Sequence, residues 1–337
     1  MTPYNPSISV VIPVYNQEIT IQQCLESVYG TKYPRMEVIV VDDCSNDSSS
    51  DIVTQFPCQI IRLEKNMGPA FARNRGVEKA KGEILFFTDS DVCLHENTLE
   101  MIAGELRDKP HLSAVFGSYG KRTGHSNFFS VYKNLVHHYG HQTAREDAST
   151  FWTGCGAIRR RIFDEVGGFN EGYRTVEDIE LGYRLVKRGY RICLNKQIQI
   201  THYKKYTFLS LIRSDVMDRA IPWTKLMLRE RIFRNDLSTK TSNILSTVVA
   251  FLALFALIST GIFWYSIYLF ALLCVSFIVL NLPFYRFIFQ ERGMLFTIKS
   301  ALMNYISYLY SGVGLLVGIC RYFSSALMKR LRFAGAR

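Results

Sequence analysis

The first two hundred residues alternate short apolar runs with amphipathic stretches. Apolar runs of strand length occupy residues 8–16, 36–43, 58–63 and 83–89. Between them, residues 19–30 and 69–82 place their apolar side chains at helical spacing. Strands that alternate with helices at these intervals predict a doubly wound α/β fold with a mostly parallel sheet.

Acidic residues follow two of these predicted strands. Asp42 and Asp43 come at the end of the run 36–43, and Asp89 and Asp91 follow the run 83–89. Ligands of such sheets bind at the carboxyl ends of the strands. We therefore expect these carboxylates to line a crevice at that edge.

The pair Asp89 and Asp91 predicts a metal site. Two carboxylates so close together repel each other unless a positive group lies between them, and this spacing suits a hard divalent cation such as Mg²⁺ or Mn²⁺ that is shared with substrate phosphates. The alternative is helix capping by aspartate. Asn97 already precedes the next predicted helix and is expected to cap it, which favours the metal.

Other common sites are not indicated. The chain has no G-x-G-x-x-G after its first strand and no G-x-x-x-x-G-K-[ST] motif. Its eight cysteines include no C-x-x-C pair, which predicts reduced thiols facing the cytosol, and its start does not resemble a signal peptide. Residues 124–129 and 137–150 are expected to be loops on the acceptor side. The spacing of His137, His138 and His141 is ordinary for a polar loop or helix face, which disfavours a metal role there.

The last third of the chain predicts membrane segments. Residues 244–285 contain no charged side chain, and a membrane helix needs about 20 residues. We expect helices at about 244–262 and 264–284 with a tight turn near 259–261. A third uncharged run, 300–320, could cross once more.

The charge distribution supports this interpretation. Residues 1–200 carry 23 basic and 24 acidic side chains, whereas residues 201–337 carry 17 and 5. The basic side chains flank the apolar runs, which indicates the cytoplasmic side of a membrane rather than nucleic-acid binding. Three crossings would put the basic tail, residues 324–337, on the opposite face, so two and three crossings both stay open.

Residues 204–243 mix large apolar and basic side chains. This composition predicts amphipathic helices in the membrane interface, broken near Pro222. Such helices would hold the predicted crevice close to the lipid surface.

Several motifs of the first 203 residues resemble those of the family 2 glycosyltransferases. In order and spacing they are IPVYN (12–16), VDDCSNDSS (41–49), GPAFARNRG (68–76), TDSD (88–91), TGCGAIRR (153–160), GGFNE (167–171) and VEDIELGYRL (176–185). The resemblance implies an A-type glycosyltransferase fold over residues 1–203 and a nucleotide-diphospho-sugar donor.

The resemblance also implies roles on the donor side. Pro13 and Tyr15 would border the base, and Asp42 or Asp43 would accept a hydrogen bond from its ring nitrogen. Arg73 would lie near the base or the phosphates.

The same resemblance assigns the metal and the diphosphate. Asp89 and Asp91 would form the metal motif, with Asp91 as the direct ligand. His202 would lie near the metal or the diphosphate, although it is equally an ordinary polar residue at a strand end. Gly154 would give a close backbone approach beside a sugar, unless it serves a glycine-rich turn alone.

Asp178 matches the catalytic base of the family, with Glu177 as the next candidate. The base would take the proton of the acceptor hydroxyl as that oxygen attacks the anomeric carbon, with inversion. Alternatively, both carboxylates stabilise the start of a helix at 177–188, with Thr175 as its cap.

The chain departs from the processive polysaccharide synthases of the family. These carry Q-x-x-R-W, whereas residues 217–223 here are MDRAIPW, so the glutamine is missing. Arg219 could still reach the diphosphate or the acceptor, with Trp223 nearby, or Arg219 could contact a lipid headgroup.

The sequence therefore predicts a membrane-anchored, inverting, metal-dependent glycosyltransferase whose catalytic domain faces the cytoplasm. It would move one sugar from a nucleotide-diphospho-sugar, with uridine expected from the family, to a lipid-linked acceptor such as a polyprenyl phosphate or a lipid-linked glycan of the cell envelope. The alternatives are a processive polysaccharide synthase and a non-catalytic nucleotide-sugar-binding scaffold. The sugar and the oligomeric state are left open.

Overall fold

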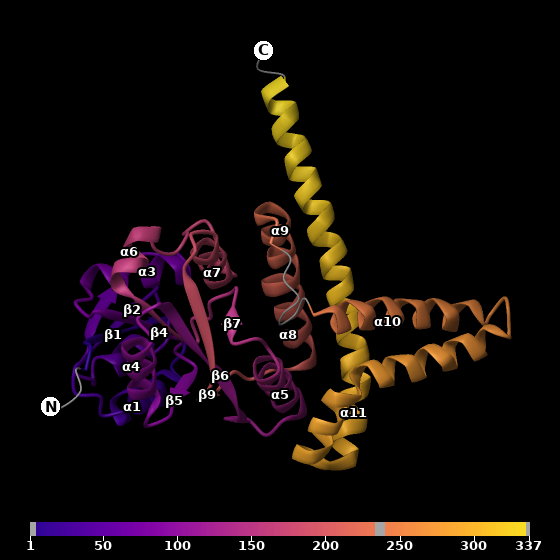
Figure 1. Cartoon of the computed structure of the whole chain (residues 1–337), viewed down its shortest axis with the longest axis horizontal. Coiled ribbons are helices and arrows are strands. Elements are labelled where there is room, and N and C mark those ends of the chain that lie inside the picture. The colour runs from indigo at the N-terminus through magenta and orange to yellow at the C-terminus, as the bar shows by residue number, and fades with distance from the viewer. Residues whose placement is uncertain (1–4, 233–239, 335–337) are drawn as a thin grey trace. The chain divides into compact units, whose positions relative to one another are not determined.

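The computed structural model describes residues 5–232 and 240–334, with side chains up to Ser325. The chain divides into two compact units, Met1–Tyr206 and Thr207–Arg337, which run from indigo to magenta and from orange to yellow in Figure 1. The division falls three residues beyond the predicted end of the first domain. Residues 233–239 of the predicted interfacial stretch and 335–337 of the predicted tail lie outside the described residues.

The first unit is built on a nine-stranded sheet. Its strands are β1 Ile8–Val14, β2 Met36–Asp42, β3 Gln59–Arg62, β4 Ile84–Thr88, β5 Val92–Leu94, β6 Leu112–Thr123, β7 Asp147–Ala148, β8 Cys155–Arg159 and β9 Arg191–His202. The order is β3-β2-β1-β4-β8-β6-β9-β5, with β7 on β9. The first four strands pair in parallel, and β8 runs antiparallel between β4 and β6. The predicted α/β class is confirmed.

Helices cover both faces of this sheet (Figure 1). They are α1 Ile21–Gly30, α2 Ser49–Val53, α3 Pro69–Lys79, α4 Thr98–Asp108, α5 Phe128–Gln142, α6 Arg160–Val166 and α7 Glu177–Lys187. Val10 and Phe86 are buried in one cluster with residues of α1 and α4, whereas their neighbour Phe87 contacts Phe163 of α6. This alternation follows from the period of two residues in a strand.

The close packing of α3 on the sheet depends on Gly76. A Cβ atom at this position would lie 2.5 Å from Cγ1 of Val11. The predicted helix 69–82 is therefore held tightly on β1, which fixes the position of its other side chains.

Some predictions about local structure are wrong. Residues 128–129 and 137–142, expected to lie in loops, belong to α5, because Val131, Leu135 and His138 bury one face of the helix. Asn97 precedes α4, but its side chain makes no capping hydrogen bond. Instead, the backbone N–H of His95 donates to Oγ1 of Thr98 at 3.0 Å.

The second unit is helical over its described residues. It comprises α8 Phe208–Arg213, the π-helix η1 Ser214–Ala220, α9 Ile221–Glu230, α10 Thr241–Ser259 and α11 Ser266–Ala334. The break expected near Pro222 is absent. Because proline lacks a backbone N–H, the turn before it widens into a π-helix and the chain continues as a helix.

Helix α11 consists of two parts joined at Gly293, whose φ of 75° interrupts the helical backbone. α10 and the first part, residues 266–292, form a hairpin (Figure 1). Both α10 and α11 are long and apolar enough to cross a membrane. The third predicted segment, 300–320, lies inside the second part.

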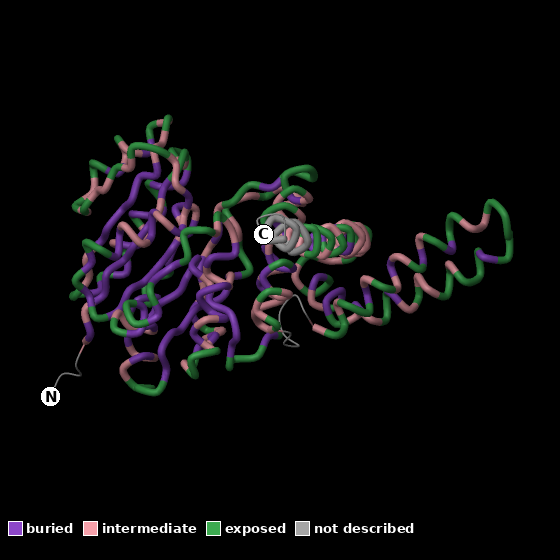
Figure 2. The backbone as a smooth tube through the Cα atoms, turned by 90° about the horizontal axis from the view of Figure 1, so that it is seen from above, coloured by how far each residue is buried: buried purple, intermediate pink, exposed green. Residues whose placement is uncertain are grey.

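Burial differs between the units. In Figure 2 the sheet is almost entirely buried, whereas the hairpin is largely exposed. A group of buried polar side chains lies at the base of the hairpin. Nδ2 of Asn281 donates to Oγ of Ser246 at 3.0 Å, and Oδ1 of Asn281 accepts from Nδ2 of Asn304 at 3.1 Å and from the hydroxyl of Tyr308 at 3.2 Å.

Candidate active site

The carboxyl end of β4 and the start of β8 bring two of the motifs together. The antiparallel register places Thr88 opposite Cys155. Oγ1 of Thr88 donates to the carbonyl of Gly154 at 3.1 Å. Asp89 and Asp91, which directly follow β4, therefore lie beside the glycine-rich segment that begins β8.

Arg73 of α3 joins the Asp89 motif to the Glu177–Asp178 motif. Its Nη2 donates to Oδ1 of Asp89 at 2.7 Å, and its Nη1 donates to Oε1 of Glu177 at 2.6 Å. The guanidinium is buried, with the residue only 3% exposed. Burial lowers the pKa of Arg73, but the surrounding carboxylates outweigh it and raise that pKa overall. Arg73 thus pairs Asp89 with Glu177 rather than with Asp91, and the positive group expected between Asp89 and Asp91 stays a prediction.

Asp178 lies at the start of α7. Its Oδ1 accepts from the backbone N–H of Ile179 at 2.7 Å, and its Oδ2 accepts from that of Thr153 at 3.5 Å. Burial, followed by the charge of Glu177, raises the pKa of Asp178 to about 7. A carboxyl group with this pKa can accept and release a proton at neutral pH.

The backbone before this carboxylate is strained. Val176 precedes α7 with a φ of 60°, in the left-handed region that β-branched residues rarely adopt. The predicted cap Thr175 is therefore not the N-cap, and Val176 makes no side-chain capping bond. Such strain is often found at functional sites, where the surrounding structure maintains it.

Asp91 faces His202 at the end of β9. Oδ2 of Asp91 lies 3.5 Å from Nε2 of His202, and the carbonyl of Asp91 accepts from the N–H of Tyr203 at 2.7 Å. Burial would raise the pKa of Asp91, but His202 and Lys204 outweigh it and lower that pKa. Asp91 is therefore held as a carboxylate.

Asp91 and His202 are the candidate ligands for the predicted divalent cation. Among the described residues, no group of three or more His, Cys, Asp or Glu side chains is arranged to hold a metal ion. Asp91 and His202 nevertheless turn a carboxylate oxygen and an imidazole nitrogen toward each other, with Asp89 two residues away. Mg²⁺ and Mn²⁺ commonly take few protein ligands and complete their shells with phosphate oxygens and water.

An aromatic group beside this site was not predicted. The ring of Tyr119 lies 4.4 Å from that of Trp152 and 5.2 Å from that of His202, measured between centroids. A Cβ atom at Gly154 would lie 2.3 Å from the indole of Trp152. The glycine is thus required by this packing, and the half-buried Trp152, two residues before it, was the available signal.

The predicted nucleotide-binding residues lie at the ends of β1 and β2. Pro13 is in β1, and Tyr15 just beyond it is 44% exposed. Oδ1 of Asp42 accepts from the N–H of Ser45 at 2.9 Å. The two carboxylate oxygens of Asp43 accept from the backbone N–H groups of Met67 and Gly68, which precede α3. The choice between Asp42 and Asp43 as the base-binding residue stays a prediction.

Arg219 and Trp223 belong to the second unit, in η1 and α9, and their predicted contact with the diphosphate or acceptor stays a prediction.

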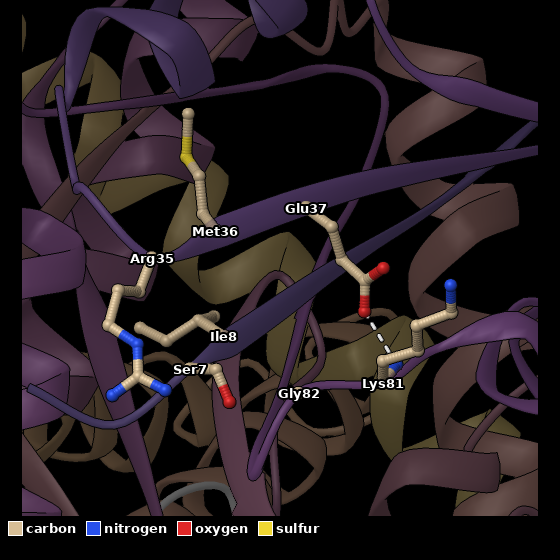
Figure 3. Close-up of a pocket in the computed structure, with 7 residues that line it drawn as sticks. All are labelled: Ser7, Ile8, Arg35, Met36, Glu37, Lys81 and Gly82. Carbon is tan, nitrogen blue, oxygen red and sulfur yellow. Dashed lines mark hydrogen bonds between the residues drawn. The ribbon is translucent and has the colours of Figure 1, made fainter.

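A pocket of about 290 Å³ lies at the opposite edge of the sheet from the carboxylates (Figure 3). It is lined by Ser7, Ile8, Arg35, Met36, Glu37, Lys81 and Gly82. Because it lies at the amino ends of β1 and β2, it is separate from the candidate active site.

Known proteins resemble this chain mainly over the first unit. Residues 9–167 match the family model for glycosyl transferase family 2, and residues 134–207 match that for the N-terminal domain of galactosyltransferase. A putative teichuronic acid biosynthesis glycosyltransferase, TuaG of Bacillus subtilis, is 38% identical over 105 residues, which are 30% of this chain and 42% of that protein. The poly-beta-1,6-N-acetyl-D-glucosamine synthase of Staphylococcus epidermidis is 30% identical over 33% of this chain and 28% of its own length. The chain thus covers less than half of either relative.

A solved structure resembles the whole chain in fold. The mannosyltransferase PcManGT of Pyrobaculum calidifontis, in complex with GDP-Man and Mn²⁺, aligns with a TM-score of 0.58 and 17% identity over 95% of this chain and 88% of its own. At this identity the match concerns the fold alone. The family model, by contrast, shows that residues 9–167 of this chain are a glycosyl transferase family 2 domain.

Proposed function

We propose that this protein transfers one sugar, with inversion, from a nucleotide-diphospho-sugar to a lipid-linked acceptor of the cell envelope. The observation that carries the proposal is the buried cluster around Arg73. It joins the carboxylate that follows β4 to the pair that begins α7, although Arg73 and Glu177 lie 104 positions apart in the chain.

Within this cluster, Asp178 is the better candidate for the base. Glu177 is occupied by its bond to Arg73 at 2.6 Å and is 5% exposed. Asp178 has no ion pair of that length, and its pKa of about 7 suits a group that is deprotonated before the reaction and protonated after it. Asp178 would accept the acceptor's hydroxyl proton while that oxygen attacks the anomeric carbon and the bond to the diphosphate breaks.

The donor would lie along the carboxyl edge of the sheet. Tyr15 and the pair Asp42 and Asp43 would hold the nucleotide at the ends of β1 and β2. Asp91, with Asp89 and His202 nearby, would hold Mg²⁺ or Mn²⁺, which neutralises the charge of the diphosphate as it leaves. A solved fold relative in complex with GDP-Man and Mn²⁺ supports both the donor class and the metal.

The acceptor would be presented at the cytoplasmic face of the cell membrane. The apolar α10 and α11 support membrane attachment, and the names of the relatives support an envelope polysaccharide. Among the possible nucleotide-sugar donors, we favour UDP-sugars.

The proposal is tested by nucleotide release from a panel of nucleotide sugars, with and without bacterial lipid extract and with and without Mn²⁺ or Mg²⁺. We expect one donor to be consumed, only with both lipid and metal, and the product to have the inverted anomeric configuration by NMR. Asp91→Asn should abolish release, whereas Asp108→Asn, an exposed carboxylate at the end of α4, should not.

Other outcomes would contradict the proposal. A folded wild-type protein that releases no nucleotide from any donor would support a non-catalytic scaffold. A product ladder of many sugars would support a processive synthase, which the name of the Staphylococcus relative keeps as the second candidate.

A further inference from the structure

We infer that the second unit enters a lipid bilayer only through the hairpin of α10 and the first part of α11, while the second part of α11 lies along the same membrane surface without crossing. This inference rests on the membrane attachment in the proposed function and adds its topology. The bound partner is a phospholipid bilayer.

The hairpin has the composition of an inserted element. Residues 244–285 of the hairpin carry no charge. Large apolar side chains on it are at least half exposed, among them Leu252, Phe255, Leu272 and Val279. In water such a surface would be strongly unfavourable. The turn between its helices carries exposed aromatic side chains, including Trp264 at 70% exposure, as residues at the polar boundary of a bilayer do.

The middle of the second part of α11 packs against η1 and α9, two helices that carry charged side chains. The hydroxyl of Tyr310 donates to Oδ2 of Asp215 in η1 at 2.8 Å. Cβ atoms placed at Gly314 and Gly318 would lie 2.8 Å from the side chains of Ala220 and Thr224. Residues 310–318 are thus in direct contact with η1 and α9.

These contacts exclude a crossing at 300–320. η1 and α9 are rich in charge. Between residues 215 and 230 they carry Asp215, Asp218, Arg219, Lys225, Arg229 and Glu230. If residues 300–320 spanned the bilayer, their contacts at 310–318 would draw these charges into the hydrocarbon, where each charged side chain is strongly disfavoured. The same contacts are compatible with a helix at the surface.

One face of the second part of α11 is suited to lie on lipid. Leu295, Leu302, Leu309, Leu316 and Phe323 recur every seventh residue and form one apolar stripe. Leu295, Leu302 and Leu316 are 69%, 64% and 57% exposed. Gly314, which packs against Ala220 of η1, is two positions from Leu316 and so about 200° away around the helix. In Figure 1, α9 lies on one side of this helix and the hairpin extends from the other.

The arrangement also resolves the conflict between the basic clusters. Arg286 and Arg292 lie near the end of the first part of α11, Lys299 follows it, and Arg321 comes later in the same helix. With a single hairpin inserted and the rest of α11 on the surface, all of these side chains lie on one face of the membrane. The positive-inside rule is then satisfied throughout.

The first test measures the depth of the stripe. Leu295→Trp, Leu302→Trp, Leu309→Trp and Leu316→Trp would each be made in the full chain carrying Trp152→Phe, Trp223→Phe and Trp264→Phe. Each would be reconstituted in phosphatidylglycerol and phosphatidylcholine vesicles with lipids brominated at different depths. We expect bromine at one shallow depth to quench all four tryptophans best. A crossing helix would place residues 295 and 316 about 31 Å apart along the membrane normal, and the quenching depth would then change from one position to the next.

A second test avoids the loss of the native tryptophans. Leu309→Arg in the stripe is compared with Leu272→Arg in the hairpin, by flotation of the full chain with the same vesicles. We expect Leu272→Arg to reduce the bound fraction severalfold and Leu309→Arg to leave it close to wild type, because a surface arginine reaches the headgroups. Equal losses for the two variants would overturn the inference. If the wild-type chain does not float with vesicles at all, the membrane attachment itself fails, whatever the nucleotide-release assay shows.

Discussion

The two units of this protein differ in what they expose and in how they bury polar groups. In the first, the sheet is packed with apolar residues, and Arg73 and Glu177 are buried as an ion pair. In the second, large apolar side chains cover the outside of α10 and α11, while Asn281, Asn304 and Ser246 are buried at the base of the hairpin. The first pattern suits water as the solvent and the second suits lipid.

The difference shows what holds each unit together. The hydrophobic effect drives the folding of the first unit, and a buried ion pair adds little net stability there although breaking one is costly. Between lipid-facing helices that force is weak, and close packing of small residues with interhelical hydrogen bonds takes its place. Substitutions of buried polar residues should therefore have unequal effects in the two units.

The largest effect on stability is expected at Arg73. Arg73→Met leaves Glu177 buried without its ion-pair partner, which should lower the free energy of unfolding of the first unit by about 3–5 kcal/mol. The measurement is urea denaturation followed by circular dichroism. Arg75→Met, on the same helix but with partly exposed partners Glu78 and Glu171, should cost about 1 kcal/mol or less. Similar losses for both would show that the Arg73 cluster is not a buried ion-pair network.

The cluster around Arg73 also shows which part of the site could be predicted from the sequence and which could not. The strands before Asp42 and Asp89 and the helix after Asp178 could be predicted because their apolar periodicity is strong. The partners of Arg73 could not, since Glu177 is 104 positions away and only the packing of α3 on β1 brings them together. A local pattern contains no such information.

The errors have similar physical reasons. The helix α5 is missed because its histidines look polar, although His138 is buried and its Nδ1–H donates to the carbonyl of Tyr119 at 2.7 Å. Thr175 was expected to cap α7, but the chain enters that helix through the strained Val176. The uncharged run 300–320 is a different case: its sequence leaves a crossing open, and its contacts with η1 and α9 support our inference that it does not cross.

A smaller effect is expected in the second unit. Asn281→Leu removes the bonds to Ser246, Asn304 and Tyr308, and should destabilise the helical hairpin by about 1 kcal/mol, as single interhelical hydrogen bonds do in membranes. The measurement is the melting temperature of the chain in detergent. Ser276→Ala, which removes only a bond to the preceding turn of its own helix, is the control. A loss comparable to that of Arg73→Met would contradict the contrast between the units.

The smallest effect concerns the pH profile. Because Asp178 must be deprotonated to accept a proton and its pKa is about 7, kcat should fall as the pH drops below 7. Glu177→Gln removes the neighbouring negative charge, which lowers the pKa of Asp178 and moves this acid limb to lower pH. Glu171→Gln, an exposed carboxylate, should leave the limb in place. An acid limb that moved upward in Glu177→Gln would contradict the assignment of Asp178 as the base.

The central claim is that Asp178 is the catalytic base, and the variant Asp178→Asn tests it most directly through three measurements on one preparation. Turnover should fall by about 10²–10⁴-fold, and donor binding should persist. The free energy of unfolding at pH 8 should rise, because a carboxyl group whose folded pKa is raised stabilises the fold at low pH and loses that stabilisation as the pH rises through about 7. Unchanged turnover, or turnover and donor binding lost together, would contradict the account.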